Sequence, residues 1–109
     1  MFQINITRPA EQDMLDCSKY IALELRNRVA AERLLNDAEE AIYSLEEMPF
    51  RYPLAKDDVL AQQGFRYFPV HNYLLFYIVR EETKTVVIER FLYGRRDWMN
   101  LLKGENKPD

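Results

Sequence analysis

The sequence predicts an α+β fold in which a helical hairpin packs on a short antiparallel sheet. Three observations lead to this prediction. Residues 2–7 alternate between apolar and polar, two stretches with helical spacing follow at 10–26 and 30–47, and three β-rich segments occupy 64–93. Because an apolar helix stripe needs an apolar partner, the hairpin should cover one face of the sheet.

The chain has 109 residues, the usual length of one domain. We expect a single domain over residues 1–103 and a frayed tail over 104–109. A domain of this size buries roughly two-thirds of its unfolded surface, which is enough for a core but not for a roomy enclosed active site.

The opening segment, 2–7, reads as a half-buried strand. Its apolar positions share one face: Phe2, Ile4 and Ile6. Pro9 suits the first turn of a helix, and Thr7 is a good N-cap for it. Glu11 and Asp13 then lie where the helix dipole favours negative charge. The first helix, 10–26, has a stripe at intervals of three or four residues: Met14, Cys17, Ile21 and Leu25.

The second predicted helix, 30–47, follows a short break at Asn27-Arg28. Its apolar face consists of Leu34, Ala38, Ala41, Ile42 and Leu45. Because the connection is only a few residues long, the two helices should be antiparallel neighbours. Pro49 ends the second helix.

Three strands are expected in the second half, at 64–70, 73–79 and 85–93, joined by polar turns. Residues 73–79 are almost wholly apolar, which predicts a central strand covered on both faces. The strands therefore form an antiparallel meander.

Two shorter helical segments complete the prediction: a turn near 59–61, within a loop, and a terminal helix at 95–102. We expect the terminal helix to cover only part of the second sheet face. This half-open face is where the sequence directs the search for function.

Cys17 is the only cysteine, so the chain can form no internal disulfide and shows no sign of an oxidising compartment. The first residues lack a signal-peptide pattern. The longest apolar run is far shorter than the about 20 residues that a membrane helix needs. We expect a cytoplasmic protein with no membrane partner.

Few side chains suit catalysis or ligand binding. With one His and one Cys, and no acidic set at ligand spacing, no metal site is expected. The three glycines are isolated, so there is no phosphate-binding loop, and we expect no cofactor. Cys17 lies on the apolar stripe and reads as a small core residue. His71 reads as a turn residue, although its pKa would suit proton transfer.

Basic residues are the better candidates for binding a target. Residues 1–50 carry a net charge of −5, whereas 51–109 carry +2. Neighbouring strands lie about 4.8 Å apart, so arginines on the later strands could converge at one end of the sheet, and the planar guanidinium group suits a phosphate. The candidates for target binding are Arg66, Arg90, Tyr93, Arg95 and Arg96. The alternative is that these arginines are simply exposed charges at the edge of the sheet. For Arg66 the two interpretations have equal weight.

The stretch NYLLFYIVREETKTVVIERFLYGRRDW, residues 72–98, strongly resembles the C-terminal hairpin of the RelE/ParE family of bacterial toxins. The upstream segments TRPAEQDM and LEEMPFRYPL also resemble that family. Together the similar segments extend over residues 2–102, and their order and spacing are more specific than any one of them.

The resemblance implies the toxin of a type II toxin–antitoxin system, with growth inhibition and plasmid stabilisation as its roles. The expected partner is a cognate antitoxin whose partly disordered segment folds across the helices and sheet of the toxin. RelE-like members act on the ribosome and cut messenger RNA, whereas ParE-like members act on DNA gyrase. A homodimer and a toxin–antitoxin hetero-oligomer both remain open.

The residues that the resemblance implies for RNA cleavage are present only in part. Arg66 and Arg96 match basic positions of RelE-like enzymes, but Leu74 stands where they have arginine, and Leu101-Leu102 where they have tyrosine. Tyr93 stands where some have histidine, and its ordinary pKa near 10 makes it a poor base. If the chain is a ribonuclease, its catalytic residues are Arg66, Tyr93 and Arg96.

Overall charge favours the other target. The sequence pI is about 5.2, whereas affinity for a polyphosphate such as the ribosome requires a strongly basic protein. The Arg-Arg-Asp pattern after the last strand is also more similar to ParE-like members. We therefore predict a toxin that poisons DNA gyrase. The alternatives are a ribosome-dependent mRNA endoribonuclease and a degenerate, non-toxic protein that binds the antitoxin, so whether the chain is an enzyme stays open.

Overall fold

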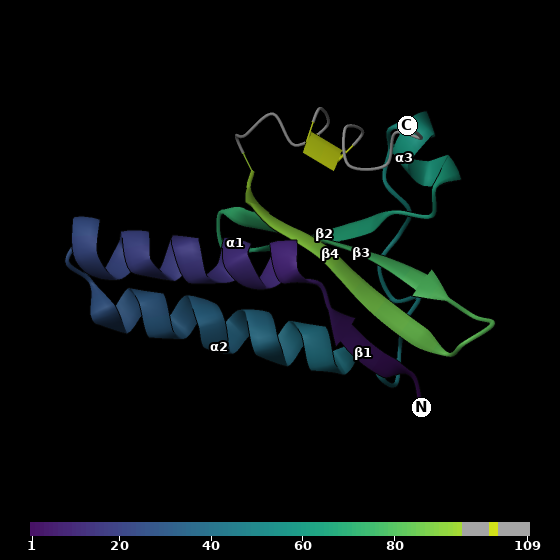
Figure 1. Cartoon of the computed structure of the whole chain (residues 1–109), viewed down its shortest axis with the longest axis horizontal. Coiled ribbons are helices and arrows are strands. Elements are labelled where there is room, and N and C mark those ends of the chain that lie inside the picture. Colours follow the sequence, from purple (N-terminus) through teal and green to yellow (C-terminus); the bar gives the residue numbers. More distant parts are fainter. Residues whose placement is uncertain (95–100, 103–109) are drawn as a thin grey trace.

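The computed structural model describes residues 1–94 and 101–102. Figure 1 shows a long helical hairpin that lies against one end of a twisted sheet and extends beyond it. In chain order the elements are β1 (Gln3–Ile6), α1 (Arg8–Lys19), the π-helical segment η1 (Tyr20–Glu24), α2 (Arg28–Ser44), α3 (Asp58–Gln62), β2 (Arg66–Val70), β3 (Tyr73–Arg80) and β4 (Thr85–Tyr93). The predicted α+β class, the hairpin and the meander are confirmed.

The four strands form one sheet in the order β1-β4-β3-β2. Strands β2, β3 and β4 are antiparallel neighbours, while β1 pairs with β4 in parallel, from Gln3 beside Thr85 to Ile6 beside Ile88. The sheet is therefore mixed. The first strand of the chain, β1, thus lies beside the last one, β4. The alternation of apolar and polar residues predicts β1 as a strand but does not reveal its partner.

Two side chains set where the hairpin helices begin. The Thr7 hydroxyl accepts a hydrogen bond from Ala10 N at 3.2 Å and donates one to Ile88 O at 2.8 Å, so the cap of α1 is also tied to β4. The side chain of Asn27 caps α2 through Ala30 N. The predicted helix at 10–26 changes to π-helical geometry at η1, and the second helix ends at Ser44, three residues earlier than expected.

The sheet is buried on both faces, as predicted for its central strand. Side chains of β3 alternate between two clusters, with Leu75 and Tyr77 toward the hairpin and Phe76 and Ile78 toward the opposite side. The second face is more fully covered than expected. Its buried members include three residues from the segment around α3, together with one from near the C-terminus: Ala55, Leu60, Phe65 and Leu102.

A β-bulge interrupts the register between β3 and β4. Phe76 pairs with Arg90, whereas the next residue, Tyr77, pairs with Ile88. As a result Ile88 and Phe91, three positions apart, both belong to the core beneath the hairpin. The bulge changes the direction of the side chains between Ile88 and Phe91, as β-bulges commonly do.

Within the described residues, no helix has the length and apolar character to span a lipid bilayer.

Candidate functional site

Two of the predicted target-binding arginines lie close together but do not share a site. Arg66 on β2 sits opposite Tyr77, and Arg90 on β4 sits opposite Phe76. The Arg66 guanidinium donates to Tyr52 O at 2.6 Å and stands 5.0 Å from the ring centre of Phe50. Arg66 therefore holds the loop before α3 against the edge of the sheet.

Arg90 forms a bidentate ion pair with Asp13 of α1. Its Nε and Nη2 donate to the carboxylate at 2.6 and 2.8 Å, and the backbone N–H of Phe91 donates to the same group at 3.0 Å. The side chains are only 12% and 9% exposed. The pair thus links α1 to the bulge of β4. One feature of the sequence indicates that Asp13 faces the core. It lies three residues after Ala10 and four before Cys17, so the three share one face of α1, and both of these neighbours are buried.

Tyr93 ends β4, well away from Arg66. It sits opposite Tyr73, while Arg66 sits opposite Tyr77, four residues further along β3. At about 3.3 Å per residue this is a separation of roughly 13 Å along the strand, and β2 and β4, which carry the two residues, lie on opposite sides of β3. Arg95, Arg96 and most of the predicted helix at 95–102 lie outside the described residues.

Cys17 and His71 do not form a nucleophile–base pair. Cys17 is buried, and its thiol donates to Met14 O at 3.2 Å. The ring of His71 lies 2.6 Å from an Asp37 carboxylate oxygen at the protein surface. The prediction of Cys17 as a core residue is confirmed. Within the part of the chain that the structure describes, no three His, Cys, Asp or Glu side chains gather to hold a metal ion.

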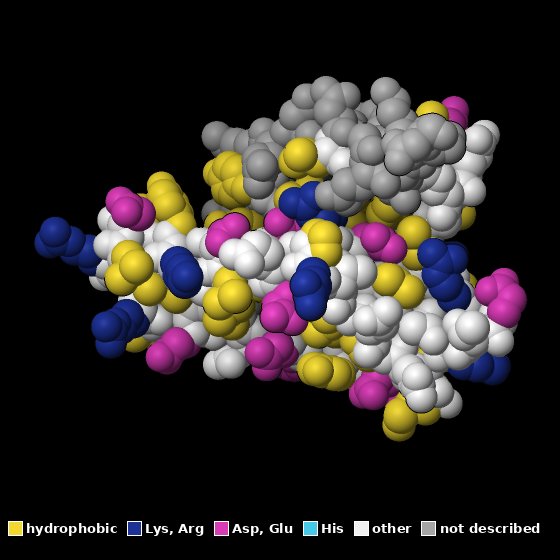
Figure 2. All heavy atoms as spheres, viewed as in Figure 1, with side chains coloured by type: hydrophobic (Ala, Val, Ile, Leu, Met, Phe, Trp, Pro, Cys, Tyr) yellow, Lys and Arg dark blue, Asp and Glu magenta, His cyan; other side chains and the backbone are white. Residues whose placement is uncertain are grey.

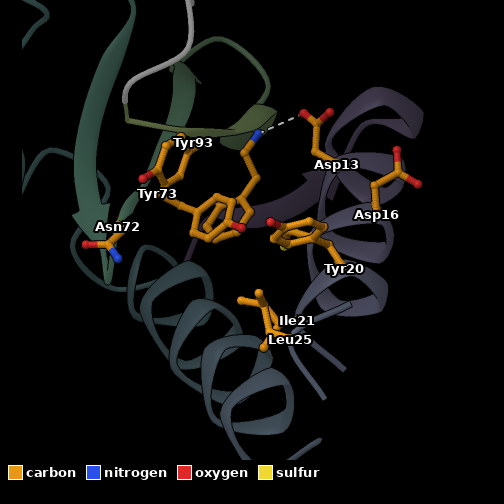
Figure 3. Close-up of a pocket in the computed structure, with 10 residues that line it drawn as sticks. Asp13, Asp16, Tyr20, Ile21, Leu25, Asn72, Tyr73 and Tyr93 are labelled. Atoms are coloured by element: carbon orange, nitrogen blue, oxygen red, sulfur yellow. Dashed lines mark hydrogen bonds between the residues drawn. The ribbon is translucent and has the colours of Figure 1, made fainter. Parts of the chain in front are cut away.

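A cavity of about 710 Å³ opens between the α1–η1 side of the hairpin and the adjoining ends of β3 and β4. Figure 3 shows three tyrosines around it: Tyr20 from η1, Tyr73 from β3 and Tyr93 from β4. Asp13 and Asp16 lie along its helical wall. We call this cavity the tyrosine pocket. Of these three tyrosines the sequence pointed only to Tyr93, as a candidate for target binding, and it did not predict the cavity.

The free end of the hairpin carries a second surface, which we call the hairpin tip. It consists of Leu23, Leu25, Arg26, Arg28 and Val29. The three apolar side chains are 57–65% exposed, values usual for polar residues. Arg26 adopts a left-handed backbone with φ of 52°, which is uncommon outside glycine. In Figure 2 hydrophobic and basic side chains lie together at this end of the molecule.

Two buried side chains, Tyr77 and Cys17, make the stability of the protein depend on pH under alkaline conditions. Burial raises the pKa of Tyr77 from 10.0 to about 12, and burial followed by the charge of Asp13 raises the pKa of Cys17 from 9.0 to about 11. Both groups are neutral when protonated, so the folded protein holds these protons more tightly than the unfolded chain does. Their contribution to stability is complete below about pH 9 and is lost as the pH rises through 11 and 12.

Tyr77→Phe tests this response. The Tyr77 hydroxyl donates to Pro49 O at 3.1 Å, so its removal should cost about 1 kcal/mol at pH 7. Between pH 8 and 11 the wild type should lose about 1 kcal/mol more stability than the variant. Urea unfolding at both pH values measures the two effects. Equal losses in both proteins would show that Tyr77 does not contribute to the alkaline transition.

The family of the chain follows from a comparison of its sequence with known protein families. Residues 4–98 match the family described as the ParE toxin of the type II toxin–antitoxin system, parDE. The chain belongs to the ParE toxin family. The match covers most of the chain, including both hairpin helices and every strand except the first residue of β1, so the resemblance inferred from the sequence is confirmed.

Solved structures of toxin–antitoxin systems share the fold of this ParE-family chain. The chromosomal ParDE system from P. aeruginosa has a TM-score of 0.66 at 19% identity, covering 85% of this chain and 96% of that chain. The RelBE2 toxin–antitoxin complex from Mycobacterium tuberculosis has a TM-score of 0.56 at 21% identity, covering 84% and 96%. No curated protein matches the sequence. At these identities the structures support the fold and not the target.

Proposed function

We propose that this ParE-family toxin inhibits growth by poisoning DNA gyrase, and that the hairpin tip is its principal docking surface. The observation that carries the proposal is the joint exposure of Leu23, Leu25 and Val29 beside Arg26 and Arg28 at one end of the molecule. Exposed apolar side chains ringed by polar groups are typical of protein–protein contacts. Arg95 and Arg96, which follow β4 in sequence, belong to the same proposal as further target contacts.

The arrangement of Arg66 and Tyr93, the two ribonuclease candidates within the described residues, also favours gyrase. RNA cleavage needs a base, a charge-stabilising group and an acid around one phosphate. Arg66 and Tyr93 lie roughly 13 Å apart along β3, as the strand spacing requires. The Arg66 guanidinium is also engaged with Tyr52 O. To act on one phosphate together with Tyr93, Arg66 would have to leave Tyr52 O, which counts against the ribonuclease alternative.

The proposed second partner is a cognate antitoxin. The two solved structures of similar fold described above come from toxin–antitoxin systems, ParDE and RelBE2. In this proposal an amphipathic segment of the antitoxin folds against the toxin and neutralises it, so that toxicity appears only when the antitoxin is lost. Such coupled folding and binding suits a labile regulator of a stable toxin.

Leu23→Asp combined with Val29→Asp should strongly impair gyrase poisoning. Two carboxylates at the hairpin tip would have to be desolvated on docking, so the concentration needed to inhibit supercoiling should rise about 30-fold, the effect of an interface hot spot. Purified gyrase, plasmid DNA and the full chain suffice for the assay. Val59→Asp is a matched control, because Val59 is 44% exposed on α3, outside the hairpin.

Four results would contradict the proposal in different ways. Wild-type protein that leaves supercoiling unaffected at excess would exclude gyrase as the target. Inhibition that the control variant and the tip variant lose equally would exclude the tip as the docking surface. Message cut in the ribosomal A site would establish the ribonuclease alternative, and unchanged growth after induction without antitoxin would establish a non-toxic partner.

A further inference from the structure

The tyrosine pocket has a chemical character unlike that of the hairpin tip. Its described lining contains two carboxylates and three tyrosines over an apolar base, and none of those lining residues is Lys or Arg. The tip, in contrast, combines apolar and basic side chains, with the exposed Glu24 between Leu23 and Leu25. A pocket of this composition disfavours phosphates and other anions, and it is suited to a positive charge.

The aromatic side chains of the pocket form a continuous wall. The rings of Tyr73 and Phe91 stack with centroids 5.1 Å apart and an interplanar angle of 7°. Tyr93 stands against Tyr73 at 70° with a centroid distance of 5.7 Å. Figure 3 shows the Tyr20 ring approaching from the helical side. The face of an aromatic ring carries the negative part of its quadrupole, so a cation is attracted to the ring faces that remain open to the pocket and not to the ring edges.

The two carboxylates are not equivalent. Asp13 already accepts three hydrogen bonds, from Arg90 and from the backbone of Phe91. Asp16 is exposed, and its Oδ1 accepts one hydrogen bond from Gln12 Nε2 at 2.8 Å. Among the described residues no donor reaches its Oδ2. Asp16 is therefore the carboxylate with an oxygen left for a positive charge, which would approach it at the outer edge of the pocket, since Figure 3 shows this carboxylate turned away from the tyrosine rings.

The environment of Tyr73 agrees with this description. Burial is the main cause that raises its pKa, followed by the neighbouring Cys17, Tyr93 and Tyr20. Its hydroxyl thus stays protonated at neutral pH. The ring faces, with Asp16 at the margin, form a partly desolvated setting in which cation–aromatic contacts are stronger than on an open surface.

We propose that the tyrosine pocket binds the cationic side chain, Arg or Lys, of a partner segment whose flanking residues are apolar. The positive group lies against the tyrosine rings and pairs with Asp16. The apolar neighbours contact Ile21 and Leu25, which line the adjacent part of the pocket. The arrangement selects a partner by charge. The pocket shares Leu25 with the hairpin tip, but it contains neither Leu23 nor Val29, the residues that the gyrase assay changes.

Peptide binding to the full-length protein tests the proposal. The probe is acetyl-Leu-Arg-Leu-amide, and its neutral counterpart carries citrulline, which preserves the shape of arginine without its charge. We expect the arginine peptide to shift the ring signals of Tyr20, Tyr73 and Tyr93 in NMR spectra and to bind at least fivefold more tightly than the citrulline peptide.

The variants locate the charge recognition. Asp16→Asn should reduce the preference for arginine at least threefold, whereas Glu11→Gln, an exposed carboxylate of the same helix that does not line the pocket, should leave it unchanged. Equal binding of both peptides, an unaltered preference in Asp16→Asn, or no shift of the tyrosine signals at any peptide concentration would overturn the proposal.

The test is independent of the proposed action on gyrase. The double variant Leu23→Asp with Val29→Asp alters the tip and not the lining of the pocket, so it should bind the arginine peptide as the wild type does. Peptide binding without gyrase inhibition would therefore reject the gyrase proposal alone, and gyrase inhibition without charge-selective binding would reject the pocket alone.

Discussion

Asp13→Ala is expected to lower the free energy of unfolding by about 3 to 5 kcal/mol, because it removes the carboxylate to which the largely enclosed guanidinium of Arg90 donates two hydrogen bonds. The same change removes the acceptor of the Phe91 N–H at the bulge of β4. Each side chain of the pair is nearly enclosed, so water can replace the lost bonds only in part. Urea denaturation at pH 7 measures the effect.

The surface pair of His71 and Asp37 provides a matched control. Its side chains are 39% and 48% exposed, and its atoms lie 2.6 Å apart, the distance also found between Arg90 and Asp13. Asp37→Ala should therefore cost about 1 kcal/mol or less, since exposed ion pairs contribute little. If the two substitutions cost the same, the link between α1 and the bulge does not stabilise the fold in the way described.

Phe76→Ala is expected to destabilise the protein by about 3 to 5 kcal/mol, the usual cost of removing a buried phenyl ring. Phe76 is fully buried on the sheet face away from the hairpin, and its ring lies 5.5 Å from that of Tyr67. For a domain with a total stability of about 5 to 15 kcal/mol, the loss would leave little of the folded population in mild denaturant.

Phe50→Ala supplies the comparison, because Phe50 is 47% exposed and should cost about 1 kcal/mol. The unfolding midpoints of the two variants, measured by circular dichroism in urea, distinguish a real second core from a loosely covered face. A Phe76→Ala variant as stable as Phe50→Ala would mean that the half-open face expected from the sequence is the better description.

Periodicity alone predicted most of the secondary structure. The alternation of Phe2, Ile4 and Ile6, the apolar run of β3 and the helical stripe of α2 each reflect one local rule: a side chain faces the core when its spacing repeats that of the backbone. The family was also accessible from the sequence, since the resemblance depends on the order of these same segments.

Helix termination was predicted less well. The stripe through Ile21 and Leu25 continued the helical period, so a single helix was expected to residue 26. The structure has a π-helical segment there, with Leu25 N bonded to Tyr20 O, followed by the left-handed Arg26. The spacing of apolar residues does not distinguish an α-helix from a π-helix, because the two differ by only about one residue per turn.

The candidate sites were decided by tertiary structure. Arg66 and Arg90 carried the charge expected of a target-binding cluster, but both are engaged within the protein, with Tyr52 O and with Asp13. The tyrosine pocket joins η1 to the ends of β3 and β4, which are about 50 residues or more away along the chain. Aromatic rings are common in protein cores, so residue type alone does not show that these rings surround a cavity.

By itself, then, the sequence determined the strands, the hairpin and membership of the toxin family. The tertiary structure decided the partner of each charged group, the burial of the second sheet face and the position of the pocket. The physical reason is that helix and strand formation depends on neighbours within a few residues. Ion pairs, bulges and cavities instead depend on which distant segments meet, and here the parallel pairing of β1 with β4 and the bulge at Arg90 determine that meeting.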